Sequence, residues 1–395
     1  MTVILQPKLR FKKNDGSDFP DWKKGILGDY GKLIKGLTYS PKNIVENGLL
    51  VLRSSNVQKN ILVLDDNVFV NLKLNEDLLS RTDDIIICVR NGSKRLIGKN
   101  AIVKNQYLPT STHGAFMTNF RGESNKFVFQ WFQTQIYKKY VWRNLGATIN
   151  SINNSDLKKF KTVFPLEIEQ QKIASFLSSV DKKIELLTKK HELLEKYKKG
   201  LMQKIFSQQI RFKQDDGSDF PEWEFTKIKN KYAIPKAKKV SDGLGPYLEI
   251  GDIDGRCNTY ELKDKLTVSG AVEVDSGILL ISTVRPNLNK ITITNQKMFC
   301  SSAFIQIKVE NNFLFYCVIR YEFRKKILGL IEGGTYPTIK SNYLLNLEIE
   351  IPVSKAEENK ISSFLSSVDK KIELIQQQIN RTKTFKKGLL QQMFV

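Results

Sequence analysis

Residues that bind metals or form disulfides are scarce in this chain, which has two histidines and four cysteines among 395 residues. The two histidines, His113 and His191, lie in unrelated segments, so neighbouring residues cannot assemble a zinc cluster. The cysteines show no Cys-x-x-Cys spacing, and most lie in apolar stretches; they are Cys88, Cys257, Cys300 and Cys317. We therefore expect small buried thiols, with no metal site and no disulfide.

Long hydrophobic runs are also missing, since no apolar stretch approaches the roughly 18 residues that a membrane span requires. The first ten residues lack the core and the cleavage site of a signal peptide. We expect no contact with a membrane and a cytoplasmic location. At 41% hydrophobic residues, the chain is long enough to bury two substantial cores.

Sequence motifs of catalysis are absent as well. The chain has no Walker A motif, no Asn/Asp-Pro-Pro-aromatic methyltransferase box and no glycine-rich cofactor turn after a strand. The acidic pairs Asp65–Asp66 and Asp83–Asp84 have no matching constellation elsewhere and are expected to be solvated turns. We expect no catalytic residue, no metal and no cofactor.

Positive charge, in contrast, is abundant. The 63 lysines and arginines outnumber the 41 aspartates and glutamates, which gives a formal net charge of +22 and a pI of about 9.6. A chain with this balance is suited to bind a polyanion, and DNA is the obvious candidate.

The chain also repeats itself. The segment Leu9–Trp22 returns in nearly identical form as Ile210–Trp223, and Phe176–Leu186 is identical to Phe364–Leu374. Two near-copies predict two similar units related by a pseudo-twofold axis, and such a protein should read a partner with two similar halves.

The second repeat lies within two long amphipathic segments. From Glu169 to Phe206, apolar residues alternate in steps of four and three, and the second copy keeps the same heptad frame from Ile361 to Thr382. Each segment is predicted to be one helix of roughly 57 Å. Pairing the two apolar stripes gives an antiparallel coiled coil within the chain. A helix pair that dimerises only with another protein is the alternative.

The remaining segments, about 23–164 and 224–351, are predicted to be mixed α/β domains. In each, short strands lead to an apolar strand that ends in an arginine-bearing turn, at Ile85–Ser93 and at Ile278–Asn287. The fold class is therefore α/β (α+β), with two globular domains separated by the two helices. The predicted boundaries are 1–164, 165–209, 210–351 and 352–395.

The repeated helices contrast with globular domains whose loops are almost unrelated. A Gly-x-Thr run precedes each helix, with Gly146 and Thr148 in the first copy and Gly333 and Thr335 in the second. The first helix carries Glu-Gln-Gln-Lys-Ile-Ala at Glu169–Ala174, where the second reads Glu-Glu-Asn-Lys-Ile-Ser. Across essentially its whole length, the chain resembles the specificity subunit of type I restriction-modification systems.

This resemblance implies a DNA-binding, non-catalytic subunit with two target recognition domains, each reading one half of a split sequence in double-stranded DNA. The helices would set the spacing and bind two modification (methyltransferase) subunits. Restriction subunits, which carry the ATP-dependent translocase and nuclease, would join through the complex. Two alternatives remain: a self-contained DNA-binding nuclease, and a coiled-coil scaffold without a nucleic-acid role.

The residues that read DNA should be loop donors, because guanidinium and amide groups recognise base edges, while lysines and hydroxyls engage phosphates. The candidates in the first domain are Arg53, Ser54, Ser55, Asn56, Arg90, Asn91, Ser93, Lys94, Arg95 and Thr112. The candidates in the second domain are Arg256, Arg285, Asn287, Asn289, Lys290, Thr335, Tyr336 and Lys340. Trp22 and Trp223 are expected to be packing anchors.

Overall fold

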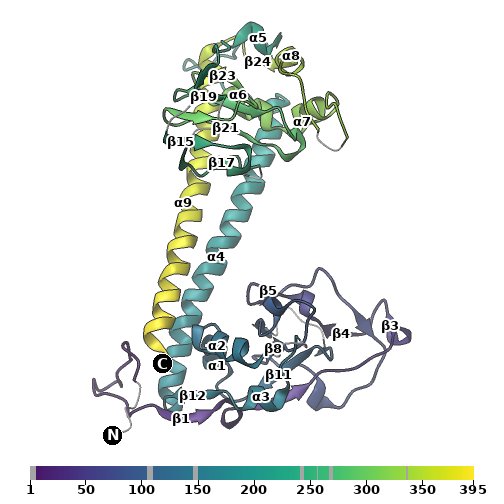
Figure 1. Cartoon of the computed structure of the whole chain (residues 1–395), viewed down its shortest axis with the longest axis vertical. Coiled ribbons are helices and arrows are strands. Elements are labelled where there is room, and N and C mark those ends of the chain that lie inside the picture. The colour runs from purple at the N-terminus through teal and green to yellow at the C-terminus, as the bar shows by residue number, and fades with distance from the viewer. Residues whose placement is uncertain are drawn as a thin grey trace. The chain divides into compact units, whose positions relative to one another are not determined.

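The computed structural model describes residues 6–104, 110–145, 150–240, 244–255, 257–266, 270–334 and 337–395. The chain divides into two compact units, each of which contains parts of both long helices (Figure 1). Unit 1 comprises Met1–Thr188 and Gln377–Val395, and unit 2 comprises Lys189–Gln376. Each unit therefore combines one globular part with the start of one long helix and the end of the other.

The long helices are α4 (Glu167–Phe206, 40 residues) and α9 (Lys355–Met393, 39 residues). In unit 1, Lys386 Nζ of α9 donates to Asp181 Oδ1 of α4 at 2.6 Å. In unit 2 the roles are exchanged, since Lys198 Nζ of α4 lies 2.5 Å from Asp369 Oδ1 of α9. The start of each helix therefore packs beside the end of the other, which confirms the predicted antiparallel pair.

The globular part of unit 1 contains two four-stranded sheets, β10-β4-β7-β3 and β2-β11-β8-β9, and the short pair β5-β6. A separate pair joins β1 (Lys23–Ile26) to β12 (Lys161–Phe164) beside the long helices. β8 is buried at every position, as its unbroken run of apolar residues predicts. The other bounds are β2 Lys32–Lys35, β3 Ile44–Val45, β4 Leu49–Leu52, β5 Val57–Gln58, β6 Ile61–Leu62, β7 Phe69–Val70, β8 Ile85–Cys88, β9 Asn100–Ile102, β10 Ser111–His113, β11 Met117–Arg121, α1 Asn125–Trp131, α2 Gln135–Asn144 and α3 Asn154–Lys158.

The globular part of unit 2 follows the same plan with a five-stranded sheet, β14-β19-β22-β15-β18, a three-stranded sheet, β21-β20-β23, and the pairs β13-β24 and β16-β17. The parallel pair β10-β4 of unit 1 has its counterpart in the parallel pair β22-β15. The bounds are β13 Glu224–Lys227, α5 Ile228–Lys231, β14 Lys238–Val240, β15 Leu244–Leu248, β16 Ile253–Asp254, β17 Thr259–Tyr260, β18 Lys263–Leu266, β19 Ala271–Val274, β20 Ile278–Ser282, β21 Ile291–Ile293, β22 Met298–Cys300, β23 Phe304–Lys308, α6 Phe313–Ile319, α7 Tyr321–Leu328, α8 Ser341–Leu345 and β24 Glu348–Ile351.

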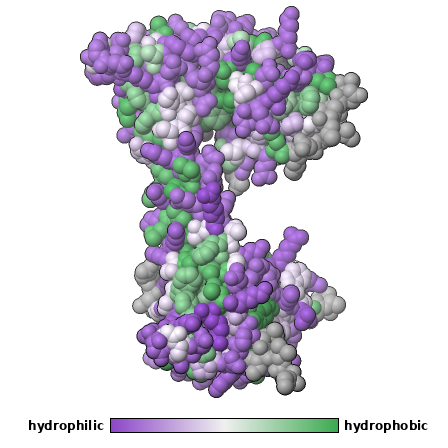
Figure 2. All heavy atoms as spheres, turned by 90° about the vertical axis from the view of Figure 1, so that its left-hand side faces the viewer, coloured by the Kyte–Doolittle hydropathy of each residue, from purple (hydrophilic) through white to green (hydrophobic). Residues whose placement is uncertain are grey.

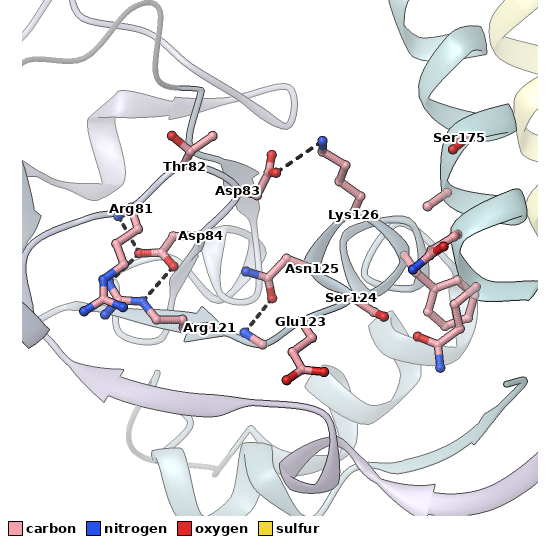
Figure 3. A pocket seen from close by; sticks show the side chains of 15 residues that line it. Arg81, Thr82, Asp83, Asp84, Arg121, Glu123, Ser124, Asn125, Lys126 and Ser175 are labelled. Atoms are coloured by element: carbon pink, nitrogen blue, oxygen red, sulfur yellow. Dashed lines mark hydrogen bonds and ion pairs between the residues drawn. The ribbon is translucent and has the colours of Figure 1, made fainter. Parts of the chain in front are cut away.

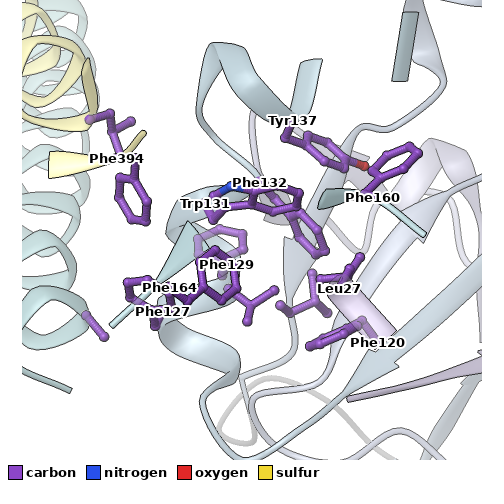
Figure 4. Close-up of a cluster of buried hydrophobic side chains, with 14 of the residues drawn as sticks. Leu27, Phe120, Phe127, Phe129, Trp131, Phe132, Tyr137, Phe160, Phe164 and Phe394 are labelled. Carbon is purple, nitrogen blue, oxygen red and sulfur yellow. The ribbon is translucent and has the colours of Figure 1, made fainter. Parts of the chain in front are cut away.

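An aromatic cluster joins the globular part of unit 1 to the long helices (Figure 4). The rings of Trp22 and Phe127 lie 6.3 and 5.3 Å from Phe394, which follows the end of α9. In unit 2 the same position is filled by Phe206 at the end of α4, with Trp223 and Phe313 around it. The two tryptophans are packing anchors, as predicted, and the helix ends are exchanged between the units.

Each tryptophan anchor is linked to a partly buried ion pair that the sequence did not lead us to expect. In unit 1, Arg10 Nη2 and Nε contact the two carboxylate oxygens of Glu169 at 2.7 and 3.0 Å. The Trp22 indole donates to the same carboxylate at 3.3 Å. Unit 2 repeats this arrangement with Arg211, Glu357 and Trp223. We refer to the two arrangements as the arginine-glutamate clamps.

Some details differ from the sequence prediction. The aromatic-rich stretches at 126–143 and 312–330 each form two helices, α1 with α2 and α6 with α7. Cys88, Cys300 and Cys317 are buried and unpaired, but Cys257 is exposed, so its predicted burial was wrong. The reason is its place in the turn between β16 and β17 rather than on an apolar strand. No helix in the described residues is both long and apolar enough to cross a membrane.

Candidate nucleic-acid interface

A one-turn 3-10 helix follows the same strand in both globular parts, at Ser54–Asn56 after β4 and at Ile250–Asp252 after β15. In unit 1 the Arg53 backbone N–H donates to Asn56 Oδ1 at 2.9 Å. In unit 2 the Glu249 backbone N–H donates to Asp252 Oδ2 at 3.0 Å. We call residues 53–56 and 249–252 the edge turns. They share one backbone frame although their sequences differ at every position.

The arginine-bearing turns that follow β8 and β20 lie in residues 89–96 and 283–290, which we call the arginine loops. In unit 1 the backbone N–H of Asn91 donates to the Asn150 carbonyl at 3.2 Å, and in unit 2 that of Arg285 donates to the Pro337 carbonyl at 2.8 Å. Asn91, rather than Arg90, therefore occupies the position of Arg285. Arg285 adopts the left-handed conformation, with φ of 48°, whereas Asn91 does not.

The edge turn and the arginine loop of unit 1 are in contact. Asn91 Nδ2 donates to Ser54 Oγ at 2.9 Å. Beside them, the Arg90 guanidinium lies 5.8 Å from the ring centre of Phe116, whose side chain is 55% exposed. Sequence reasoning missed Phe116, since a lone aromatic between β10 and β11 carries no local signal of exposure. These residues form one continuous surface with cationic, amide, hydroxyl and aromatic groups, which suits contact with bases.

The corresponding surface of unit 2 has different chemistry. Arg324 of α7 donates to the Asn287 carbonyl at 3.3 Å and so supports the arginine loop. Lys340 pairs with Glu332 at 3.1 Å and lies over the Tyr343 ring. The two surfaces share a backbone arrangement but present different side chains. They therefore suit different base sequences.

The structure sorts the eighteen candidate residues by burial. Exposed side chains, suited to reach a partner, belong to Ser55, Arg90, Ser93, Lys94, Arg95, Arg285, Asn287 and Lys340. Half-buried side chains belong to Arg53, Ser54, Asn91 and Lys290. Buried side chains belong to Asn56, Thr112 and Asn289. Arg256, Thr335 and Tyr336 lie outside the described residues, as do Gly146 and Thr148 of the first Gly-x-Thr run.

The three buried candidates donate to backbone carbonyls instead of facing a groove, which corrects their expected exposure. Asn56 Nδ2 donates to the carbonyls of Val63 and Asp66 at 3.0 and 3.1 Å. Thr112 lies in β10 and donates to a backbone carbonyl at 2.8 Å. Asn289 Nδ2 donates to another at 2.9 Å. The sequence of a loop does not distinguish short polar side chains that point to solvent from those that bond the backbone.

A pocket of about 440 Å³ lies in unit 1 between the globular part and the start of α4 (Figure 3). Asp84 is buried there and accepts from Arg121 Nη2 and Nε at 2.7 and 2.9 Å. Asp83 pairs with Lys126 at 3.2 Å. Asp84 was expected in a solvated turn, which is wrong. Within the described residues, no group of three or more His, Cys, Asp or Glu side chains is arranged to hold a metal ion.

The three buried thiols are poorly suited to nucleophilic chemistry. Burial raises the pKa of Cys88, and it raises the pKa of Cys300 and of Cys317 to about 12. Thiols with such pKa values are protonated near neutral pH and therefore unreactive.

We predict that Arg90→Ala weakens specific DNA binding by about 1–3 kcal/mol, because an exposed arginine can bind a guanine edge through two hydrogen bonds. The loss of binding energy should be confined to base pairs of one half-site. Arg285→Ala should weaken binding only at the other half-site. Selection of binding sites from random duplexes measures both effects. Arg81→Ala, on the pocket side of unit 1, is the control and should leave the selected sequence unchanged. Equal weakening on unrelated sequences would make Arg90 a phosphate contact instead.

Comparison with known proteins gives matches over nearly the whole chain. A family model described as the type I restriction modification DNA specificity domain matches twice, at residues 20–196 and 223–384. The type I restriction enzyme MjaVIII specificity subunit of Methanocaldococcus jannaschii is 24% identical, over 99% of this chain and 96% of that protein. The putative type I restriction enzyme MjaX specificity subunit of the same organism is 26% identical, over 99% and 97%.

A solved structure has the same fold. The crystal structure of the type I restriction-modification system S subunit from M. genitalium superimposes with a TM-score of 0.64 at 16% identity, and the match covers 99% of both chains. Both globular parts and both long helices thus have counterparts in a single known chain.

Proposed function

Because the chain belongs to the family of type I restriction modification DNA specificity domains, we propose that it is the DNA sequence-specificity subunit of a type I restriction-modification complex. Each globular part reads one half of a split sequence in double-stranded DNA. One observation carries this proposal: the two globular parts share a backbone arrangement, but different side chains occupy its equivalent positions. Equivalent positions hold Arg53 and Glu249 on the edge turns, and Asn91 and Arg285 on the arginine loops.

Charge supports DNA as the partner. The net charge of +22 gives the chain a strong attraction to the phosphate backbone. Exposed Lys94 and Arg95 lie on the same loop as Arg90. They are suited to hold phosphates while Arg90 reaches base edges. We place the chain in the cytoplasm, together with the DNA that it reads.

The long helices are suited to dock the modification subunits. Leu186 and Leu374, at identical positions of the repeat, are 55% and 48% exposed, and Tyr197 and Phe385, also at equivalent positions, are 54% and 56% exposed. Each unit thus presents one exposed leucine and one exposed aromatic from its two helix segments. Figure 2 shows hydrophobic side chains gathered on the helices, where much of the surrounding surface is hydrophilic. Exposed apolar groups that occur twice favour two copies of one partner.

In this proposal the chain supplies recognition, and its partners supply the chemistry. The modification subunits bring the methyl-transfer site, and the restriction subunits, bound through the complex, bring ATP-driven cleavage. The helices hold the two readers at a set spacing along the DNA. The paired state of Asp83 and Asp84 argues against a nuclease site of its own in the pocket of unit 1.

We predict that the purified chain neither methylates nor cuts DNA when given S-adenosylmethionine, Mg²⁺ and ATP. Co-production with its modification subunits should give methylation at one bipartite sequence, since those subunits carry the methyl-donor site. Sequencing of methylated bases in the host DNA identifies that sequence. Methyl transfer by the chain alone, or methylation at a single continuous site, would contradict the proposed function.

A further inference from the structure

One lysine occupies the same backbone position in each globular part, where the chain returns from the arginine loop to pair with the preceding strand. The backbone N–H of Cys88 donates to the Lys99 carbonyl at 2.9 Å, and that of Ser282 donates to the Lys290 carbonyl at 3.0 Å. The residue before each lysine has a left-handed backbone, with φ of 80° at Gly98 and 53° at Asn289. The two lysines are therefore structural equivalents.

Both lysines extend to the end of the edge turn in their own unit. Lys99 Nζ donates to the carbonyls of Ser54 and Val57 at 2.5 and 3.0 Å. Lys290 Nζ donates to the carbonyl of Ile253, which follows its edge turn as Val57 follows the other. Both side chains are half-buried. Each ammonium group is thus directed inward, toward backbone oxygens.

This placement has a clear physical effect. A short 3-10 turn leaves carbonyl oxygens at its end with few or no backbone donors, and an ammonium group offers three donors to them. Burial lowers the pKa of Lys99, in keeping with an ammonium removed from solvent. The Ser54 carbonyl also accepts from the Val57 N–H. Loss of the ammonium would therefore remove a charged donor from partly buried carbonyls, and the turn would relax toward water.

Each edge turn is held by a lysine and by a side-chain cap, although the residues of the two turns differ. The cap is Asn56 in one unit and Asp252 in the other, and it bonds the first backbone N–H of the turn in both. If the lysine only stabilised one particular turn, it would not need to occur in both units, where the turn sequences are unrelated. A lysine that sets the position of a reading element is expected in both units.

We propose that Lys99 and Lys290 are positioning residues, which fix the edge turns so that their side chains meet defined base pairs. This inference rests on the proposed function. It also reassigns Lys290, which the sequence suggested as a direct DNA contact. In unit 1 the fixed turn holds Ser54 against Asn91 of the arginine loop, so the lysine also sets the relative position of two reading elements.

The test uses the chain co-produced with its modification subunits, and maps methylated sites for the wild type and for Lys99→Met. Methionine keeps the length and apolar stem of lysine but removes the donors. We expect discrimination to fall by roughly tenfold or more at some base pairs of one half-site, while the rest of that half and the other half-site keep theirs. Lys290→Met should give the mirror result. Lys73→Met and Lys308→Met, at exposed lysines of the same units, are the matched controls and should change nothing.

The inference is overturned if the folded Lys99→Met variant discriminates at every base pair as the wild type does. It is also overturned if this variant loses discrimination equally in both half-sites. If Lys99→Met unfolds the first reader, Lys99→Gln decides, because its amide keeps a donor for one carbonyl. A folded Lys99→Gln reader should discriminate less at the same base pairs, and wild-type discrimination there overturns the inference. Failure of the proposed function is distinct, since the wild type itself would then show no bipartite methylated sequence.

Discussion

Replacement of residues 23–164 by the equivalent segment of another family member is expected to change one half of the recognised DNA sequence and to leave the other half intact. The ends of this segment are paired in the structure, because Lys23 of β1 lies opposite Phe164 of β12. A graft therefore enters and leaves through one two-stranded ladder. It must also supply an aromatic residue at Phe127, which packs on Phe394 of α9. The arginine-glutamate clamp stays outside the graft.

The effect should be large, because each mismatched base pair costs about 1–3 kcal/mol of binding and a half-site contains several. Methylation-site mapping measures it on the complete methyltransferase. The reciprocal graft of residues 224–351 is the matched control, since Glu224 and Ile351 are paired in the same way. It should change only the other half. Changes in both halves from a single graft would contradict independent reading.

Loss of either arginine-glutamate clamp is expected to destabilise its unit by about 3–5 kcal/mol, because the variant leaves a partly buried guanidinium without its buried carboxylate partner. The side chains of Glu169 and Glu357 are both 0% exposed, while those of Arg10 and Arg211 are 20% and 19% exposed. Glu169→Ala should act on unit 1 and Glu357→Ala on unit 2. Urea unfolding followed by hydrogen exchange in β1 and β13 separates the two effects.

A control is available within the same clamp. Glu222 also pairs with Arg211, at 3.3 Å, but its side chain is 89% exposed. Exposed ion pairs contribute at most about 1 kcal/mol. Glu222→Ala should therefore change the free energy of unfolding far less than Glu357→Ala. Equal effects of the two variants would show that burial does not set the strength of this clamp.

The fold was predictable where its signal is local or repeated. The helices α4 and α9 follow from heptad spacing, because a stripe of apolar residues can be buried only against another stripe. The two globular parts follow from the repeat and from unbroken apolar strands such as β8 and β20. Trp22 and Trp223 were identified as anchors because they recur in the same short segment.

The sequence predicted which loops form the candidate interface, but not which of their side chains are exposed. Reasoning from residue type selected Arg90, Arg285 and their neighbours, because donors in loops are suited to base edges. It could not separate the exposed Asn287 from the buried Asn289, since both are asparagines in one turn. It also missed Phe116, whose exposure depends on how β10 and β11 are joined.

The sequence by itself determined that this protein has two similar halves, two long helices and a strong positive charge, because each of these is a property of spacing or composition. Only the tertiary structure decided which positions of the halves correspond. Asn91 matches Arg285, and Lys99 matches Lys290, through backbone hydrogen bonds to strands that lie far away in the chain. The arginine-glutamate clamps also depend on such contacts, since Arg10 and Glu169 are 159 residues apart. Residue type and local pattern carry no information about partners at that separation, because those pairings form only when the whole unit packs.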